Sequence, residues 1–116
     1  MKSIKFEKTL EERIHYSTTL KNKYQDRIPV IIEKDIRCKD SIEISKNKYL
    51  FPRTMNISEI ITIIRKNIKM DSSKAIFIFV NGTLVPMNNS IESIYYSHAN
   101  EDGFLYVTYT YESTFG

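Results

Sequence analysis

The carboxyl end of the chain carries the group with the clearest chemical potential, a glycine carboxylate on a short tether. Residues 104–111 alternate aromatic and β-branched side chains, a pattern typical of a strand that uses both of its faces. Residues 112–116 have too little apolar content to continue that strand, and they lead to Gly116. Because glycine has no Cβ, its backbone can enter a narrow enzyme channel that any other residue would block. The alternative is a frayed terminus without function.

Other potentially reactive side chains do not form a catalytic or metal-binding pattern. Cys38 could act as a nucleophile if His15 or His98 supplied a base, but its sequence neighbours are Arg37 and Lys39 in a polar stretch. Two isolated histidines and one cysteine do not make a zinc-binding pattern, and the glycines form no phosphate-binding loop. Basic residues are scattered among acidic ones, which argues against nucleic-acid binding. The sequence favours a protein that is not an enzyme and needs no cofactor or metal; an enzyme built on Cys38 is the alternative.

Length and composition indicate a single folded domain over residues 1–116. Apolar residues make up 41% and charged residues 27% of the chain, which is ordinary for a folded domain. The formal net charge of +3 is compatible with anionic lipid headgroups or acidic peptides. No apolar run approaches the length of a membrane span, and the N-terminus lacks the apolar core of a signal peptide. A single cysteine cannot form an internal disulfide, which favours a reducing cytosolic setting.

The first quarter of the chain has the period of an amphipathic helix. Thr9 followed by Glu12 has capping-box spacing, so residues 1–9 are expected to be an addition with its own short helix. We expect residues 1–25 to form a helical extension of the main fold. Its inward face is predicted from apolar positions at spacings of three or four, namely Phe6, Leu10, Ile14, Ser17, Leu20 and Tyr24.

Two short strands bordered by proline are predicted next, over residues 27–34 and 48–52, with a polar loop at residues 35–47 between them. Pro29 has no N–H to donate, so the first strand cannot have a continuous ladder on one side there, and Pro52 ends the second strand. An edge with apolar side chains beside unpaired backbone can accept a peptide as an added strand.

A second helix is predicted over residues 56–70. Asn56 and Glu59 have capping-box spacing at its start, and Ile63 lies off its apolar stripe, which indicates a second apolar contact. The buried stripe is predicted to comprise Ile57, Ile60, Ile61, Ile64 and Ile68.

The last third of the chain predicts a turn-rich set of strands and one more helix. Residues 75–80 have no polar side chain, which predicts a strand buried on both faces, and Asn81-Gly82 predicts a turn after it. Asn89 and Glu92 are expected to cap a short helix before the final strand.

The predicted order is therefore helix, β, β, helix, β, helix, β, which is an α+β pattern. This order fits a ubiquitin-like β-grasp roll over residues 26–111, in which the last strand enters the sheet from a distant position in the sequence. A ferredoxin-like split βαβ arrangement is the main alternative.

Four stretches of the chain resemble the autophagy ubiquitin-like modifier family, which includes the GABA-receptor-associated protein and the microtubule-associated light chain 3 proteins. The resemblance extends over essentially the whole chain, with little room for insertions. Residues 114–116 are similar to the processed carboxyl end of that family. The four stretches, which occur in the family's order, are residues 27–31, 46–52, 74–81 and 102–109.

The resemblance implies a ubiquitin-like core with two N-terminal helices packed on it and a flexible tail over residues 112–116. It implies that Gly116 is activated as an adenylate, passed as a thioester to two enzyme cysteines and joined to the amine of phosphatidylethanolamine. Phe115 would be gripped by these activating and conjugating enzymes. A cysteine protease removes residues after this glycine in most members. The implied setting is the cytoplasm, and an autophagosomal or related membrane once the lipid is attached.

The resemblance also implies that receptors and adaptors bind through short peptides with an aromatic residue, two spacers and an aliphatic residue, added as a strand beside residues 48–52. Arg27, Lys46 and Lys48 would meet acidic residues that flank this motif. The aromatic pocket would comprise Leu20, Pro29, Ile31, Lys48, Leu50 and Phe104. The aliphatic pocket would comprise Tyr49, Phe51, Pro52, Met55, Ile60, Ile63 and Ile64, although Leu20, Ile60 and Ile64 also fit a core.

Two positions and one turn depart from the family; at the turn, Asp71-Ser72 replaces a proline-containing sequence. Tyr16 stands where many members have an acidic residue that meets the ligand's indole N–H, which leaves open whether Trp is preferred over Phe or Tyr. Asn67 replaces a common arginine, which predicts weaker selection for acidic residues in the peptide. Two further functions stay open: an adaptor that is never conjugated, and conjugation to protein lysines.

Overall fold

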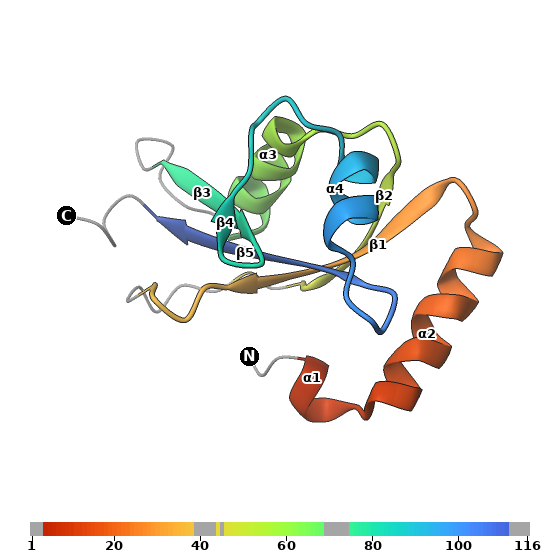
Figure 1. Cartoon of the computed structure of the whole chain (residues 1–116). Helices are drawn as coiled ribbons and strands as arrows, with labels where there is room; N and C mark the ends of the chain where they lie inside the picture. Colours follow the sequence, from red (N-terminus) through yellow and green to blue (C-terminus); the bar gives the residue numbers. More distant parts are fainter. Residues whose placement is uncertain (1–3, 39–43, 45, 69–74, 112–116) are drawn as a thin grey trace.

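The structure is a computed structural model that describes residues 4–38, 44, 46–68 and 75–111. Figure 1 shows a sheet with α3 and α4 on one side and α1 and α2 on the other. The helices are α1 (Ile4–Glu7), α2 (Leu10–Lys23), α3 (Ile57–Ile68) and α4 (Ile91–His98). The strands are β1 (Arg27–Lys34), β2 (Lys48–Pro52), β3 (Ile76–Val80), β4 (Thr83–Leu84) and β5 (Leu105–Tyr111).

The sheet has the order β2-β1-β5-β3-β4 and is mixed. The last strand, β5, lies at the centre, parallel to β1 and antiparallel to β3. β1 and β2 pair directly as antiparallel neighbours, with Ile28 opposite Phe51 and Val30 opposite Tyr49. A split βαβ unit would place a helix between its first two strands, so the structure confirms the α+β ubiquitin-like roll and excludes the ferredoxin-like alternative.

The main core lies between the sheet and α3. The predicted stripe of α3 is confirmed, because Ile57, Ile60, Ile61, Ile64 and Ile68 are all buried. The capping box is also present, since the Glu59 N–H donates to the Asn56 side chain (3.0 Å) and the Asn56 N–H donates to Glu59 (3.2 Å). Alternate residues of the strands complete this core, among them Ile28, Val30, Ile32, Ile76, Ile78, Leu105, Val107 and Tyr109.

A second, smaller cluster lies on the opposite face, where α1 and α2 meet β1 and the start of β5. Ile4, Ile31 and Phe104 are fully buried there. Three partly buried side chains pack against them, Tyr16, Leu20 and Tyr106. These six residues are called the N-terminal cluster below. The Thr9–Glu12 capping box that begins α2 is present, as predicted.

The predicted inward face of the N-terminal helices is confirmed at Ser17 and Leu20 and wrong at Leu10, Ile14 and Tyr24; the Phe6 side chain lies outside the described residues. Leu10 and Ile14 are 36% and 40% exposed, and the buried residue of the helix is Ser17. Besides Tyr16 and Leu20, the face that contacts the fold carries polar side chains, with Arg13 and Lys21 half-buried on either side of Ser17. The reason is that α2 meets the turn before β5, whose carboxylate and carbonyl groups need donors rather than methyl groups.

Three smaller predictions also need correction. α4 is capped by Ser90, whose hydroxyl accepts from the Ser93 N–H (3.3 Å), and not by Asn89. β3 is buried on one face only, because α1 and α2 cover β1 and β5 and leave Phe77 and Phe79 half-buried. The loop after β1 is not simply polar, since Cys38 (7% exposed) and Ile44 (2% exposed) reach the main core.

Candidate functional site

Among the described residues, β2 pairs with β1 alone, so it forms an edge of the sheet. The Ile32 N–H donates to the Asn47 carbonyl (2.8 Å), which identifies these two residues as a hydrogen-bonded pair of the ladder. Such pairs alternate along an antiparallel ladder, so Lys48 and Leu50 turn their backbone groups away from β1. Pro52, the next outward position, offers a carbonyl but no N–H.

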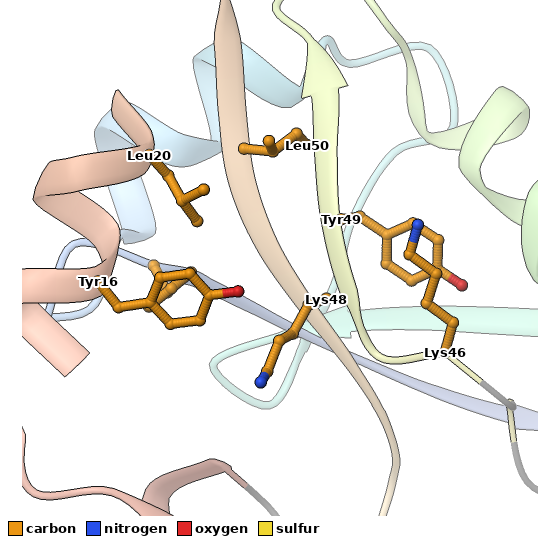
Figure 2. A pocket seen from close by; sticks show the side chains of 7 residues that line it. Tyr16, Leu20, Lys46, Lys48, Tyr49 and Leu50 are labelled. Carbon is orange, nitrogen blue, oxygen red and sulfur yellow. The ribbon is translucent and has the colours of Figure 1, made fainter. Parts of the chain in front are cut away.

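An open cavity of about 240 Å³ adjoins this edge. Figure 2 shows Leu20 of α2 and Leu50 of β2 pointing toward one another across β1, with Tyr16 alongside Leu20. The Tyr16 ring meets the Phe104 ring edge-on, with 5.6 Å between centroids, and Lys48 Nζ lies 5.4 Å from the Tyr16 centroid. Aromatic rings and aliphatic side chains with a nearby cation suit an incoming aromatic side chain. The lining is Tyr16, Leu20, Lys46, Lys48, Tyr49, Leu50 and Phe104.

This cavity brings together much of the aromatic pocket that the resemblance implies. Pro29 and Ile31 are buried and are not part of its lining; Ile31 belongs instead to the N-terminal cluster. Tyr16 was not among the predicted site residues, although its i, i+4 spacing from Leu20 places both on one helix face. The implied pocket residues that do line the cavity are Leu20, Lys48, Leu50 and Phe104.

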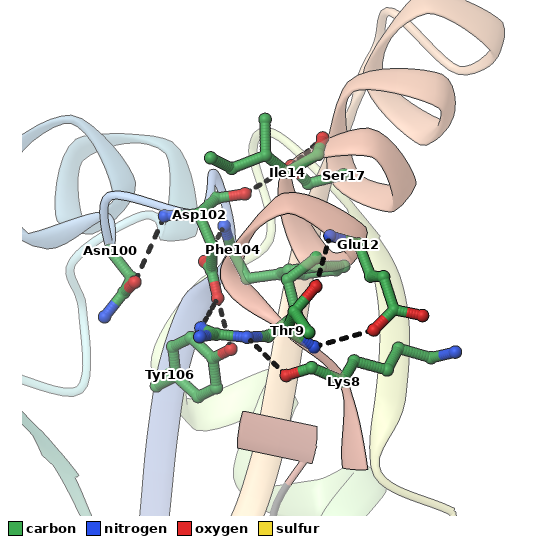
Figure 3. A network of polar contacts seen from close by, with 10 residues as sticks. Lys8, Thr9, Glu12, Ile14, Ser17, Asn100, Asp102, Phe104 and Tyr106 are labelled. Carbon is green, nitrogen blue, oxygen red and sulfur yellow. Dashed lines mark hydrogen bonds and ion pairs between the residues drawn. The ribbon is translucent and has the colours of Figure 1, made fainter. Parts of the chain in front are cut away.

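α2, which carries Tyr16 and Leu20, is attached to the sheet by a polar network around Asp102 (Figure 3). Arg13 Nη1 donates to Asp102 Oδ2 (2.7 Å), and the Asp102 side chain has no exposed surface. Tyr106 donates to the same oxygen, and the Phe104 N–H donates to Oδ1 (2.9 Å). Burial, together with the hydrogen bond to Asp102, raises the pKa of the Tyr106 phenol far above its usual range. The phenol therefore stays a donor throughout the physiological range.

Gly103 allows α2 to approach the sheet this closely. Its φ is +90°, and a Cβ built on it would lie 2.4 Å from Ser17 Oγ. The Ser17 hydroxyl is within donating distance of the Asp102 carbonyl, and Tyr95 donates to the Gly103 carbonyl (2.8 Å). The separation between Leu20 and Leu50, and so the width of the cavity, depends on this turn.

On the α3 side of β2 lies a second apolar region. The Tyr49 and Phe51 rings are stacked, with 5.1 Å between centroids. Asn67 Nδ2 donates to the Tyr49 hydroxyl (2.7 Å), and burial raises the pKa of that phenol. Met55 and Ile63 are half-buried and pack against the main core. The off-stripe Ile63 therefore packs at the border of the main core, and the second apolar contact stays a prediction.

The residues implied for the aliphatic pocket fall into two groups. Ile60 and Ile64 have no exposed surface and belong to the main core, as does Phe51 at 4% exposure. These residues can form the floor beneath a pocket. Ile60 and Ile64 cannot contact a ligand directly in this structure, because neither side chain reaches the surface. Pro52, Met55 and Ile63 are half-buried, whereas Tyr49 is buried in the main core and also lines the cavity.

Cations lie at both ends of β2. Lys46 is exposed, with Nζ 5.1 Å from the Tyr49 ring centroid, and Lys48 is half-buried beside the cavity. At the other end, Arg27 Nη1 donates to the Leu50 carbonyl (3.4 Å), one of the groups that points away from β1. All three cations therefore adjoin the edge, which is the arrangement needed to meet acidic residues flanking a bound strand.

The residues implied in conjugation, Phe115 and Gly116, lie outside the described residues. β5 leads toward them from the centre of the sheet, where Tyr111 is paired with Ile76. Within the described part of the chain, no helix is long and apolar enough to cross a membrane. No group of three or more metal-ligating side chains occurs in the same described part, and Cys38 is buried.

Comparison with known proteins identifies the family. Residues 12–116 match the family described as "Autophagy protein Atg8 ubiquitin like". The chain is 46% identical to Autophagy-related protein 8A of Oryza sativa subsp. indica over 98% of this chain and 95% of that protein. It is 45% identical to Autophagy-related protein 8a of Arabidopsis thaliana over 98% and 93%. The crystal structure of Trypanosoma brucei ATG8 superposes with a TM-score of 0.91 and 29% identity over 100% of this chain and 99% of that one. The chain therefore belongs to the Atg8 family of ubiquitin-like autophagy proteins.

Proposed function

We propose that this chain is a ubiquitin-like modifier that is conjugated through Gly116 to phosphatidylethanolamine on autophagosomal or related membranes, where it recruits partners with aromatic-x-x-aliphatic motifs. It acts as an acyl donor and a docking surface, and the family's activating and conjugating enzymes supply the catalysis. A processing cysteine protease and motif-bearing receptors are its further partners.

The observation that carries the recruiting role is the cavity beside an unpaired strand edge. Lys48 and Leu50 each present a backbone N–H and C=O away from β1, which is what an added strand needs. The Arg27 guanidinium, now on the Leu50 carbonyl, is displaced when the ligand's own N–H takes that acceptor. Its charge then becomes available to an acidic residue of the ligand.

The spacing of the motif follows from the two sides of β2. In an extended strand, residues i and i+3 point to opposite faces and lie roughly 10 Å apart along the strand. A ligand pairing with β2 therefore places its aromatic residue in the cavity near Leu20 and Leu50, and its aliphatic residue near Met55 and Ile63. Two spacers are what this geometry requires.

Strand addition is tested by measuring the affinity of a fluorescent aromatic-x-x-aliphatic peptide. Leu50→Ala should weaken binding by about 10-fold or more, because the side chain forms one wall of the aromatic cavity. Leu84→Ala is the matched control, since Leu84 is 56% exposed and lies in β4 at the other edge of the sheet. Equal affinities for both variants, with both folded by circular dichroism, would refute the assigned edge.

Conjugation is tested by mass spectrometry after incubation with the family's activating and conjugating enzymes, ATP and phosphatidylethanolamine liposomes. We expect a lipid adduct on Gly116 that Gly116→Ala does not form. A thioester without lipid would favour conjugation to protein lysines. Absence of a thioester, with enzymes active on a known member, would favour an adaptor that is never conjugated.

A further inference from the structure

Ile36 is the most exposed large apolar side chain among the described residues, at 99% of its full surface. It lies just after β1, and neither the main core, the N-terminal cluster nor the β2 edge involves it. Complete exposure of an isoleucine keeps its apolar surface in water, which is unfavourable unless something covers that surface in the working state.

The turn that presents Ile36 is well anchored on both sides. Asp35 is buried, its N–H donates to the Tyr109 carbonyl (2.9 Å), and its carboxylate accepts from the Thr108 hydroxyl (3.0 Å). Cys38, on the other side, is buried and its N–H donates to the Asp35 carbonyl (2.9 Å). Ile36 is therefore held out into solvent between two buried neighbours.

The position of this turn relative to the conjugated end is given by the parallel pairing of β1 and β5. Lys34, the last residue of β1, is opposite Tyr109, so the turn that carries Ile36 begins beside the end of β5, which is Tyr111. Figure 1 shows the ends of β1 and β5 on the same side of the molecule. The five residues from 112 to 116 span at most about 18 Å when fully extended. Any lipid attached to Gly116 is therefore tethered close to Ile36.

We infer that Ile36 inserts into the interface of the bilayer to which the chain is conjugated, so that the β1 end of the sheet faces the membrane; this inference rests on the proposed function. Lys34 and Arg37 flank it, and the Arg37 side chain is 55% exposed and paired with Asp35. One isoleucine with flanking cations is too weak to bind a membrane alone. The two acyl chains of the attached phosphatidylethanolamine supply the anchoring, and insertion of Ile36 sets the orientation of the domain on the bilayer.

This orientation has a consequence for recruitment. Arg27 and Pro52, at the other end of the β1–β2 ladder, are seven residues along β1 from Lys34, or roughly 23 Å at strand spacing. The peptide-binding edge is thereby held upright, with its Arg27 end away from the membrane and open to receptors.

The absence of tryptophan from the chain makes a clean experiment possible. Ile36→Trp introduces a single fluorescent reporter at a position where nothing is disturbed. Tyr96→Trp is the matched control, because Tyr96 is also exposed (70%) but lies near the start of β1, at the opposite end of that strand from Ile36. Its position there is given by Arg53, which donates both to the Tyr96 hydroxyl and to the Gln25 carbonyl just before β1. Both variants are conjugated enzymatically to liposomes of phosphatidylethanolamine, phosphatidylcholine and an anionic lipid, with and without brominated acyl chains.

We expect the tryptophan emission of Ile36→Trp to shift to the blue and to be quenched by brominated lipid only after conjugation, while the emission of Tyr96→Trp stays unchanged. Because tryptophan itself favours membrane interfaces, hydroxyl-radical footprinting of the unmodified sequence checks the native side chain. Oxidation of Ile36 should fall on conjugation while that of Tyr96 does not. A lipid adduct with unchanged emission from Ile36→Trp and unchanged Ile36 oxidation overturns this inference alone; failure to form the adduct overturns the proposed function.

Discussion

The two faces of the sheet are stabilised in different ways. The main core is almost entirely apolar, with five isoleucines of α3 packed on alternate residues of the strands. Among the described residues, the fully buried apolar members of the N-terminal cluster are Ile4, Ile31 and Phe104, and the polar network around Asp102 attaches α2 beside them. The main core therefore stabilises the fold as a whole, and the opposite face sets the distance between α2 and the β2 edge of the sheet.

The difference teaches that a binding cavity can be adjusted without risk to the fold. Apolar packing is cooperative and tolerates little change in volume. A hydrogen-bonded attachment such as the one between Arg13 and Asp102 is local, so changing it should loosen α2 and leave the main core intact. Four substitutions test this contrast.

The largest effect is expected from Ile64→Ala in the main core. Ile64 has no exposed surface, and truncating a buried isoleucine should lower the free energy of unfolding by about 2–5 kcal/mol through lost transfer energy and the cavity left behind. Urea unfolding followed by circular dichroism measures this change. Hydrogen exchange should accelerate throughout the sheet; an effect confined to α3 would contradict a single cooperative core.

The next largest effect is expected from Asp102→Asn. It should lower the free energy of unfolding by about 2–3 kcal/mol, because it leaves a partly buried Arg13 without its charged partner. Hydrogen exchange should accelerate in α2 while α3 stays protected. Glu92→Gln is the matched control, since its ion pair with Arg53 spans 3.4 Å between side chains that are 38% and 35% exposed, and it should change stability little. Uniform acceleration in the Asp102 variant would show that the two faces are not separable.

Gly103→Ala should lower the free energy of unfolding by about 1–2 kcal/mol, because alanine at a φ of +90° is strained and its Cβ would collide with Ser17 Oγ. Ser17→Ala in the same chain should recover part of this loss by removing the hydroxyl, and the φ penalty should remain. A thermal-unfolding double-mutant cycle measures both terms. Strict additivity of the two changes would mean that the collision is relieved in another way.

The smallest effect is expected from the pH dependence contributed by Asp35, which joins the end of β1 to β5. The hydrogen bond from Arg37 lowers its pKa from 3.8 to about 2. A carboxyl whose pKa is depressed in the folded state stabilises the fold above its unfolded value and loses that contribution as the pH falls toward the folded value. The urea midpoint should therefore fall between pH 3.8 and about 2, and less steeply in Asp35→Asn. If the urea midpoint of Asp35→Asn fell with pH as steeply as that of the unchanged chain, the Asp35 carboxyl would be excluded as a source of the pH dependence.

Local pattern predicts the main core well. β1 and β2 begin and end where the prolines and β-branched runs indicate. The buried stripe of α3 is predicted completely, because its isoleucines follow the 3.6-residue period of a helix. The family resemblance places Leu20, Lys48, Leu50 and Phe104 at the cavity.

The N-terminal face is harder to predict because its contacts are distant in sequence and polar. Arg13 and Asp102 are 89 positions apart, and no periodicity marks a salt bridge of that kind. The apolar spacing of Leu10 and Ile14 wrongly predicts that they face inward. The surface that α2 contacts instead accepts hydrogen bonds from the Ser17 hydroxyl and the Arg13 guanidinium. The resemblance marks Tyr16 as a position that faces the ligand, but its edge-on contact with Phe104 comes from the tertiary structure.

The edge formed by β2 also has to avoid pairing with a second copy of the chain. An open strand with outward N–H and C=O groups is a template for self-association. Here Pro52 withholds a donor, Arg27 occupies the Leu50 carbonyl, and Lys46 and Lys48 would meet their own counterparts as like charges. The same residues that would meet an acidic, extended ligand thus also oppose strand pairing between two copies of the chain.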